Sequence, residues 1–324
     1  MTSFEIPIVV VSKCLGFDAC RYNGEMLHDA VLEKLADYVR IITTCPEVEI
    51  GLGTPRDPIR IVEEGQQGLK LIQPATSKDV TGDMNRFSTD FLGSLSEVDG
   101  FILKSRSPSC ALKDAKVFTG VEKAPVKGKG PGLFGFAVLE KYGHLAVEDE
   151  GRLKNYSIRE HFLIKLFTLA RFRQLKKASS HKALVEFQSQ NKYLFMAYHQ
   201  IQQKKLGKII ANLEQNSIKE VYRSYEQGLY ELLERPATGQ SNINVLFHIL
   251  GYFKHSISAK EKAFFLSLIE KYRGMKVPLS SPLGVLKAWA VRFDNEYLMK
   301  QSYFEPYPEA LVELLDSGKG RDLS

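Results

Sequence analysis

The most distinctive chemistry in this sequence lies in its four cysteines, Cys14, Cys20, Cys45 and Cys110. Four thiols in 324 residues are too few for a disulfide scaffold, and a reducing cytosol would keep them as free thiols. Such thiols are either buried core residues or metal ligands and nucleophiles. Their positions relative to the predicted strands and helices therefore have to distinguish these roles.

The first 145 residues alternate between strand and helix patterns. Short apolar and β-branched runs, typical of buried parallel strands, lie at 8–11, 39–43 and 100–103. Helical spacing of apolar residues predicts helices over 26–38, 79–95 and 132–142. This alternation predicts an α/β domain whose parallel sheet is close to the doubly wound type, with right-handed crossovers.

Three of the cysteines follow these predicted strands. Cys14 lies just after the first strand, Cys45 just after the second, and Cys110 in the loop after the third. In an open α/β sheet, ligand sites form outside the carboxyl ends of the strands. Thiols as much as 96 residues apart in the sequence can therefore converge at one edge of the sheet.

From about residue 157 onward the pattern is helical. The expected helices span 157–177, 181–205, 216–234, 241–254, 259–273 and 283–301. Two Ser-x-x-Glu sequences, which begin at Ser157 and Ser258, have the form of capping boxes. Charged residues and Gly151 interrupt the apolar periodicity near 148–154, so we expect an α/β domain over 1–150 and an all-α helical domain over 151–324.

The net charge of +6 is unevenly distributed along the chain. Residues 1–150 carry 17 Lys/Arg and 22 Asp/Glu, whereas residues 151–324 carry 27 and 16. The stretch 152–208 alone holds 13 basic residues against two glutamates. A basic half joined to an acidic half indicates binding to a polyanion, although a solvated helical surface rich in Lys would show the same bias.

Four basic residues end the first long helix of the second half: Arg171, Arg173, Lys176 and Lys177. They are candidates for RNA phosphate contacts, and they also complement the helix dipole, which is a sufficient structural reason for some of them. Aromatic residues interleave with the charges at Phe167, Phe172, Tyr193 and Tyr198. Helical spacing places most of these rings in the core, which leaves one or two to stack on unpaired bases.

The N-terminus lacks the basic segment and the small-residue cleavage site of a signal peptide. No window approaches the run of about 18 apolar residues that a membrane helix requires. We therefore expect a cytoplasmic protein that does not bind membranes.

A glycine motif, Gly130-Pro-Gly-Leu-Phe-Gly135, fits the G-x-G-x-x-G fingerprint of dinucleotide-binding proteins. That fingerprint should follow the first strand of a βαβ unit, whereas this one closes the predicted domain, and Pro131 lacks a backbone N–H. Dinucleotide binding is therefore disfavoured, and the helix N-terminus stays a candidate donor for a developing anion.

The cysteine-bearing segments resemble the signature of the DUF523 family, whose characterised members are thiouracil desulfidases. The matching stretches are 12–24, 45–56 and 103–110, together with Asp79-Val-Thr81. The second half resembles DUF1722 over 184–198, 206–207 and 297–308. Gln188 departs from that pattern, which has His at this place. The chain as a whole resembles proteins in which DUF523 and DUF1722 domains are fused. Such proteins are associated with removal of sulfur from 4-thiouridine in transfer RNA.

This resemblance implies a [4Fe–4S] cluster held by Cys14, Cys45 and Cys110, with one iron not bound by the protein. Clusters normally take four thiolates, and an open iron is a site for a soft ligand such as a thiocarbonyl sulfur. Three thiolates and an open position also suit zinc. The family pattern has no cysteine at Cys20, for which we expect a packing role outside the site.

The resemblance also implies roles for two further residues. Glu47 matches a catalytic carboxylate that activates water, and Ser107 matches a catalytic serine. Three cations in the same loops could pair with substrate phosphates or face solvent: Arg56, Lys104 and Arg106.

The predicted reaction removes the sulfur of a thiolated uracil, depends on the iron–sulfur cluster and involves no net redox change. The favoured substrate is 4-thiouridine within tRNA. One alternative is a desulfidase of free thiouracil. Another is a non-catalytic iron–sulfur redox sensor that binds nucleic acid, which would have no use for Glu47 or Ser107. The expected partner is tRNA or a thiolated nucleobase, and no protein partner is predicted.

Overall fold

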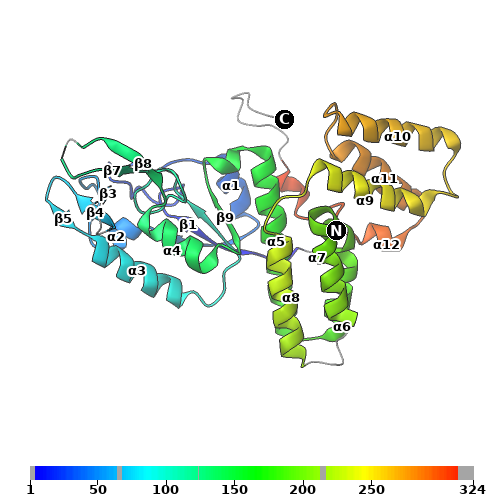
Figure 1. The fold of residues 1–324 in the computed structure, drawn as a ribbon, viewed down its shortest axis with the longest axis horizontal. Helices are drawn as coiled ribbons and strands as arrows, with labels where there is room; N and C mark the ends of the chain where they lie inside the picture. Colours follow the sequence, from blue (N-terminus) through cyan, green and yellow to red (C-terminus); the bar gives the residue numbers. More distant parts are fainter. Residues whose placement is uncertain (1–3, 64–67, 123, 212–216, 313–324) are drawn as a thin grey trace. The chain divides into compact units, whose positions relative to one another are not determined.

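The computed structural model describes residues 4–63, 68–122, 124–211 and 217–312 (Figure 1). The chain forms two compact units. One contains the described residues up to Ala170 together with 310–312, and the other contains the described residues of 171–309. The division falls inside helix α5 (Tyr156–Ala178). The sequence-based limit between residues 150 and 151 stays a prediction of where the two functional modules meet.

A four-stranded parallel sheet is the centre of the first unit. Its strands are β1 (Ile8–Ser12), β2 (Arg40–Thr44), β6 (Gly100–Leu103) and β9 (Ala146–Asp149), in the order β2-β1-β6-β9. The central strands β1 and β6 are fully buried, which is why they are continuous apolar runs and not alternating ones. The expected α/β class, with a helical region in the second half, is confirmed (Figure 1).

The strand order explains where a site can form. The chain passes from β1 to β2 on one side, and then places β6 and β9 on the opposite side of β1. This reversal is the doubly wound arrangement, in which ligand sites form at the carboxyl ends of the strands beside the reversal, here β1 and β6. The two ends are tied together there, because the backbone N–H of Lys104 donates to Ser12 Oγ at 2.9 Å.

Three helices in this unit differ little from expectation. Helix α4 (Leu133–Tyr142) matches, and α3 (Thr81–Ser94) begins two residues late because β5 (Lys78–Asp79) precedes it. Helix α1 (Ala30–Ala36) is shorter than the predicted 26–38. Asp29 sets its start by accepting hydrogen bonds from the amides of Val31 and Leu32, as an N-cap does.

A second, five-stranded sheet was not predicted. It comprises β3 (Arg60–Glu63), β4 (Leu69–Gln73), β5, β7 (Ala115–Phe118) and β8 (Val126–Gly130), in the order β5-β4-β3-β7-β8. Only β3 and β7 are parallel neighbours, and the other pairs are antiparallel. These strands are short and partly exposed, and β8 has the sequence Val-Lys-Gly-Lys-Gly, so no apolar period marks them.

The rest of the chain is helical. Its helices after α5 are α6 (His181–Gln190), α7 (Lys192–Ala211), α8 (Ile218–Leu232), α9 (Gly239–Leu250), α10 (Ala259–Arg273), α11 (Ser280–Arg292) and α12 (Glu296–Met299). Two predicted helices are each divided. The 181–205 segment breaks at Asn191, the C-cap of α6, and the 283–301 segment breaks at Asp294, which has a φ of 50°.

The two predicted capping boxes have different outcomes. Ser258 and Glu261 form the expected box at the start of α10. Ser157 does not cap α5, because the helix begins one residue earlier, and the side chain of Asn155 accepts from the amide of Ile158 instead.

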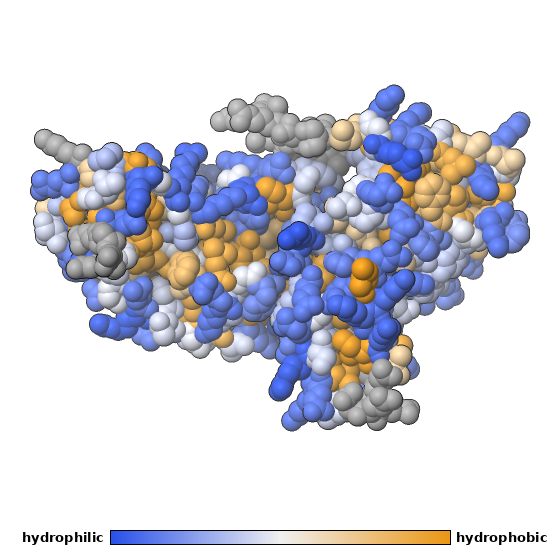
Figure 2. All heavy atoms as spheres, viewed as in Figure 1, coloured by the Kyte–Doolittle hydropathy of each residue, from blue (hydrophilic) through white to orange (hydrophobic). Residues whose placement is uncertain are grey.

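Helix α8 illustrates how the second unit buries its core. Its buried residues recur at helical spacing, at Val221, Tyr222, Tyr225, Gly228, Leu229 and Leu232. The opposite face is mostly hydrophilic where it is visible in Figure 2. This separation is the amphipathic pattern of a surface helix. No helix in the described part of the chain is both long and apolar enough to cross a membrane.

Candidate functional site

The carboxyl end of β2 carries two of the predicted site residues. Cys45 is the N-cap of the short helix α2 (Pro46–Glu49), and Pro46 occupies the first helical position. Proline is suited to this position because it needs no donor there and its φ is already helical. The chain therefore leaves the sheet at Cys45 and turns at once, which places Glu47 beside the end of the strand.

All four cysteines are free thiols and buried. Burial raises the pKa of Cys14 to about 11, and the neighbouring charge of Cys45 contributes to the same shift. Burial also raises the pKa of Cys110 well above its ordinary value; Cys14 and Cys45 add to this shift, and a hydrogen bond with Ser12 opposes it. Cys14, Cys45 and Cys110 therefore lie close enough to influence one another's ionisation, at the sheet edge where they were expected.

Cys20 does not lie outside this group, which corrects the expectation from the sequence. The Cys45 thiol donates to the backbone carbonyl of Cys20 at 3.7 Å, and the pKa of Cys20 is raised to about 12 by burial and by Cys45. The reason is the fold of the loop after β1, in which the amide of Asp18 donates to the carbonyl of Lys13 at 3.0 Å. That turn brings the following residues back toward the strand ends.

Two kinds of metal centre take thiolate ligands of this type. A zinc ion requires thiolate sulfurs about 2.3 Å from one point. Among the residues that the structure describes, no group of three His, Cys, Asp or Glu side chains could hold a single metal ion. A cluster of several irons spreads its thiolate ligands over a larger volume. Three buried thiols contributed by three separate loops are soft donors of the kind that both zinc and iron–sulfur clusters take.

Glu47 is held by hydrogen bonds at both carboxylate oxygens. Its Oε2 accepts from Arg56 Nε at 2.9 Å and from Arg56 Nη2 at 2.7 Å. Its Oε1 accepts from Ser109 Oγ at 3.0 Å and from Ser107 Oγ at 3.4 Å. The structure therefore brings the two predicted catalytic residues, Glu47 and Ser107, into one network and adds Arg56 and Ser109 to it.

Ser107 has a fixed polarity in this network. Its Oγ accepts from the amides of Ser109 at 3.2 Å and Cys110 at 3.1 Å, so its own proton is directed to Glu47. Because Cys110 is one of these donors, Ser107 is tied to the backbone of the predicted cluster ligand.

The expectation that Arg56 binds substrate phosphate is corrected by its surroundings. Its side chain is only 3% exposed and forms an ion pair with Glu47, which is 12% exposed. Its Nη1 donates to the carbonyls of Cys20 at 3.0 Å and Gly53 at 2.8 Å. Its backbone amide donates to the carbonyl of Tyr22 at 2.8 Å. The guanidinium thus links the Glu47 carboxylate to the loop that carries Cys20 through hydrogen bonds.

Lys104 is also engaged within the protein and not presented to phosphate. Its ammonium pairs with Glu150 and donates to the Ser105 carbonyl at 3.0 Å. Glu150 in turn accepts from the Ser105 amide and hydroxyl, both at 2.7 Å. The pair lies near Cys14, since Lys104 lowers the pKa of that thiol and Glu150 raises it.

Arg106 is the exposed cation of the three. Its φ is 61°, an unusual conformation for a residue other than glycine, and its amide donates to Asp114 Oδ1 at 2.7 Å. Its guanidinium stays a predicted phosphate ligand at the edge of the cysteine loop.

Two residues of the site were not predicted from the sequence. Ser109 is fully buried and follows Ser107 by two positions in the matching motif, a proximity that could have revealed it. Glu150 directly follows β9, a strand that was not predicted, so no sequence signal marked it.

The glycine motif serves close packing and not nucleotide binding. A Cβ at Gly132 would lie 2.4 Å from the carbonyl oxygen of Ser109, and one at Gly135 would lie 2.2 Å from that of Ala111. The amides of Gly132, Leu133 and Gly135 donate to carbonyls of the cysteine loop, those of Ala111, Pro108 and Ser109. These donors of α4 are therefore occupied, which corrects the expectation that the helix would stabilise an anion.

Several basic residues of the stretch 152–208 are buried or paired within their own unit. Arg159 and Lys165 are buried in the first unit, and Arg152 pairs with Glu148 at 2.6 Å. In the second unit, Arg171 donates to Gln190 and lies over the Phe187 ring at 5.5 Å.

Lys176 pairs with Glu226 at 2.7 Å. Arg173 is half-buried and Lys177 is exposed. Three of the interleaved aromatics, Phe167, Phe172 and Tyr193, are buried, so they cannot stack on bases.

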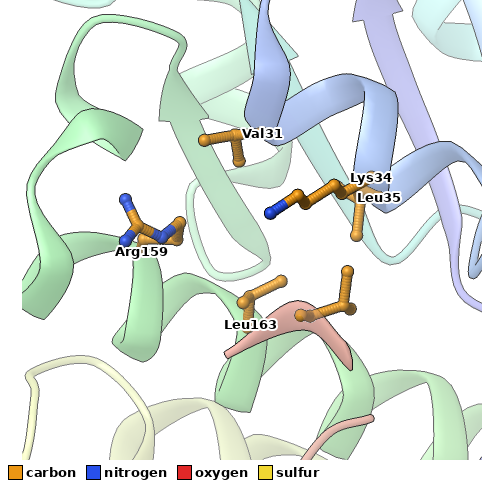
Figure 3. A pocket seen from close by; sticks show the side chains of 6 residues that line it. Val31, Lys34, Leu35, Arg159 and Leu163 are labelled. Carbon is orange, nitrogen blue, oxygen red and sulfur yellow. The ribbon is translucent and has the colours of Figure 1, made fainter. Parts of the chain in front are cut away.

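A separate small pocket lies in the first unit (Figure 3). It is lined by Val31, Lys34, Leu35, Arg159, Leu163 and Leu311. It shares no residue with the cysteine site and contains none of the predicted site residues.

Two parts of the chain match two different protein families. Residues 9–150 match the family described as 2-thiouracil desulfurase, and residues 192–308 match DUF1722, a family of unknown function. The uncharacterised protein YbgA of Escherichia coli (strain K12) is 33% identical over 158 residues, which are 48% of this chain and 93% of that protein. The uncharacterised protein YbbK of Bacillus subtilis (strain 168) is 35% identical over 109 residues, 32% of this chain and 72% of that protein.

Among solved structures, the chain is similar to the [4Fe–4S]-dependent thiouracil desulfidase TudS. The two are 27% identical, and the match covers 45% of this chain and 93% of that chain, with a TM-score of 0.36.

Proposed function

Because the chain belongs to the 2-thiouracil desulfurase (DUF523) family and carries a DUF1722 region, we propose that it removes the sulfur of 4-thiouridine in tRNA. The observation that carries the proposal is the hydrogen-bonded pair of Glu47 and Ser107, which lies beside buried thiols that influence one another. A hydrolytic desulfidase needs such a carboxylate, whereas a redox sensor would need only the cysteines.

The residues that would hold the cofactor are Cys14, Cys45 and Cys110. The fit rests on their softness as ligands, their burial and their position at the carboxyl ends of the strands. A [4Fe–4S] cluster bound there would supply a Lewis-acidic iron without a protein ligand, suited to a thiocarbonyl sulfur.

The reaction exchanges one sulfur for one oxygen without a change in oxidation state. Water adds to the pyrimidine carbon that bears the sulfur, the carbon–sulfur bond then breaks, and the sulfur leaves as hydrosulfide. Glu47 takes the proton of the attacking water. Oε1 is the oxygen suited to this, because its 3.4 Å hydrogen bond with Ser107 is the longest that Glu47 accepts and is the one a water can replace.

Arg56 and Ser109 are positioning residues in this scheme. Arg56 occupies Oε2 with two donors, and Ser109 holds Oε1 from a fully buried position. The carboxylate therefore has little freedom to rotate. Fixing a base within hydrogen-bond reach of its proton is a large part of its catalytic effect.

The basic helical unit supports the choice of tRNA over a free base. Residues 171–309 carry 21 Lys/Arg against 12 Asp/Glu, a net charge of +9, and a free thiouracil would not require such a module. Arg173 and Lys177 are proposed as its phosphate ligands, with Arg106 contributing near the cysteine site. Arg171 and Lys176 would join them by exchanging Gln190 and Glu226 for phosphate.

The test is anaerobic purification, reconstitution with iron and sulfide, and incubation with tRNA that contains 4-thiouridine. Loss of the thiolated nucleoside, measured by mass spectrometry, and equimolar hydrosulfide are expected. Free 4-thiouracil and 2-thiouracil are assayed in parallel. Turnover of the free bases alone would replace the tRNA substrate with a nucleobase, and no turnover of any substrate by cluster-loaded protein would reject the enzyme.

A further inference from the structure

A cluster of three tyrosines in the second unit lies outside the desulfidase site. Tyr193 is in the first turn of α7, Tyr252 in the 3₁₀ helix η4 (Gly251–Phe253), and Tyr297 in α12. The rings of Tyr252 and Tyr297 are stacked, with centroids 6.0 Å apart and an interplanar angle of 22°. Tyr193 meets both rings edge-on, at 6.3 Å and 6.4 Å.

Hydrogen bonds and burial hold the three tyrosines in place. Tyr193 is buried, and its hydroxyl donates to that of Tyr252 at 2.9 Å. Burial raises the pKa of Tyr297, while hydrogen bonds with Ser189 and Gln301 oppose the shift. Gln301 also joins the two matching DUF1722 segments, because its side chain donates to the Ser189 carbonyl at 2.8 Å. Stacking surfaces held in this way lose little conformational entropy when a ligand binds.

The ring of Tyr252 is exposed to solvent. Tyr252 is 43% exposed, which is unusual for an aromatic ring that is hydrogen-bonded and stacked on a second ring. Phe167, Phe172 and Tyr193, by contrast, are buried. Tyr252 is therefore one of the exposed aromatic rings of the basic unit, whereas most of the rings that the sequence pattern had indicated are buried.

Two lysines lie close to these rings, one in space and one in the sequence. The Lys192 ammonium lies 5.4 Å from the centre of the Tyr193 ring. Lys254 follows Tyr252 by two residues, is exposed, and has no ion pair with any residue in the described ranges. The nearby carboxylate of Glu296 is paired with Lys300 at 3.5 Å. Lys192 and Lys254 thus add positive charge beside the tyrosine cluster.

We infer that Tyr252, stacked on Tyr297, is a platform on which one unpaired RNA base stacks, with Lys192 and Lys254 facing its phosphates. This assignment rests on the proposed function, because it requires that the substrate be an RNA. A flat, exposed, π-stacked surface beside cations matches a nucleobase, whose faces are aromatic and whose backbone is anionic. A folded peptide would gain little from an open ring without a surrounding apolar pocket.

The test compares Tyr252→Ala with Tyr252→Phe in the full-length, cluster-loaded protein. Binding of a fluorescently labelled, unmodified tRNA transcript is measured by anisotropy over a range of salt concentrations. Removal of one base–aromatic stack should weaken binding about 5- to 140-fold for the alanine variant. The phenylalanine variant keeps the ring and should bind within about twofold of wild type. The salt slope should stay unchanged, since the cations that neutralise phosphates are all still present.

Phe264→Ala is the matched control. Phe264 is a 57% exposed aromatic residue on α10 of the same unit, and it does not contact the three tyrosines through a ring–ring interaction. It should bind tRNA as wild type does. Thermal unfolding of each variant checks the fold, and a short single-stranded RNA should compete with tRNA better than a duplex of the same sequence.

Two results would overturn the platform while leaving the desulfidase proposal standing. One is wild-type affinity of Tyr252→Ala in a folded protein, and the other is an equally weakened affinity in Tyr252→Phe, which would assign the effect to the hydroxyl. If wild-type protein bound no RNA but still released hydrosulfide from free thiouracil, the tRNA substrate and the platform would both be rejected. The separate turnover measurement distinguishes these cases.

Discussion

The guanidinium of Arg56 and the carboxylate of Glu47 form a two-point contact, with Nε at 2.9 Å and Nη2 at 2.7 Å from the same oxygen, Oε2. The pair is almost fully buried, so its geometry is set by the protein and not by solvent. The other oxygen, Oε1, is left to Ser109 and Ser107. Arg56 thereby decides which oxygen of Glu47 is available for chemistry.

Replacing Arg56 by lysine should lower turnover about 10- to 100-fold, because one ammonium cannot reproduce the planar two-donor arrangement and Glu47 would shift. The cluster content and absorbance should be retained. Arg86→Lys on α3 is the control, since Arg86 is an exposed residue paired only loosely with Asp83 at 4.0 Å. Equal rates for wild type and Arg56→Lys would show that the position of Glu47 does not limit the reaction.

Glu47→Gln should keep the iron–sulfur absorbance and reduce turnover about 10²- to 10⁴-fold, because an amide cannot accept the proton of water. Steady-state hydrosulfide release is the measurement. Glu49→Gln provides a control in the same helix, as Glu49 is exposed and outside the network. Equal rates of hydrosulfide release in the two variants would show that Glu47 has no chemical role in the reaction.

Cys20 can be separated from the three predicted ligands by iron and sulfide analysis. Cys14→Ser, Cys45→Ser and Cys110→Ser should each lose most of the bound iron after anaerobic reconstitution, because the hydroxyl is a hard and weak ligand for iron. Cys20→Ser should retain about four irons per chain, with at most a modest decrease in stability from its altered packing against Cys45. Loss of the cluster in Cys20→Ser would make Cys20 a fourth ligand and remove the open iron.

Charge reversal at the end of α5 should affect RNA binding electrostatically. Lys177→Glu should weaken tRNA binding and lower the salt slope by about 0.7–0.9 for each phosphate that is no longer neutralised. Lys271→Glu, at an exposed position on α10, is the comparison. Identical slopes for wild type and Lys177→Glu would place the phosphate ligands elsewhere in the helical unit.

His161 should make the unfolding free energy depend on pH. Burial lowers the pKa of this histidine to about 4, and Lys165 adds to the shift. Because the folded state resists protonation, the full stability is present above the ordinary pKa of about 6.5 and is lost as the pH falls toward 4. The decrease should amount to about 3 kcal/mol at the lower end of that window.

Urea unfolding of the cluster-free protein at several pH values measures this dependence. His161→Gln should flatten the curve between about pH 4 and 6.5. His28→Gln should not, since the side chain of His28 is 78% exposed. A curve that is steep in both variants would assign the pH dependence to other groups.

Much of the architecture was predictable from local pattern. The three apolar runs became β1, β2 and β6, because a strand buried on both faces must be continuously apolar. The positions of Cys14, Cys45 and Cys110 after those strands were enough to predict their convergence, since parallel strands end at the same edge. The family motifs supplied Glu47 and Ser107.

The tertiary structure alone decided how the charged groups are used. Arg56 and Lys104 have the same sequence signature as surface cations, yet each is largely buried against a carboxylate. Glu150 is 46 residues from Lys104 and directly follows an unpredicted strand. Such pairings depend on which chain segments the fold brings together, and no local periodicity encodes them.

The same limit applies to the second sheet and to the tyrosine platform. The strands of that sheet are short and half exposed, so their pairing comes from neighbours far along the chain. Tyr193, Tyr252 and Tyr297 are spread over 105 residues and three helices. Sequence by itself determined which segments are buried and which motif residues are present. Side-chain contacts between distant segments form only when the chain folds. These tertiary contacts decided which charged and aromatic side chains are buried, paired or exposed.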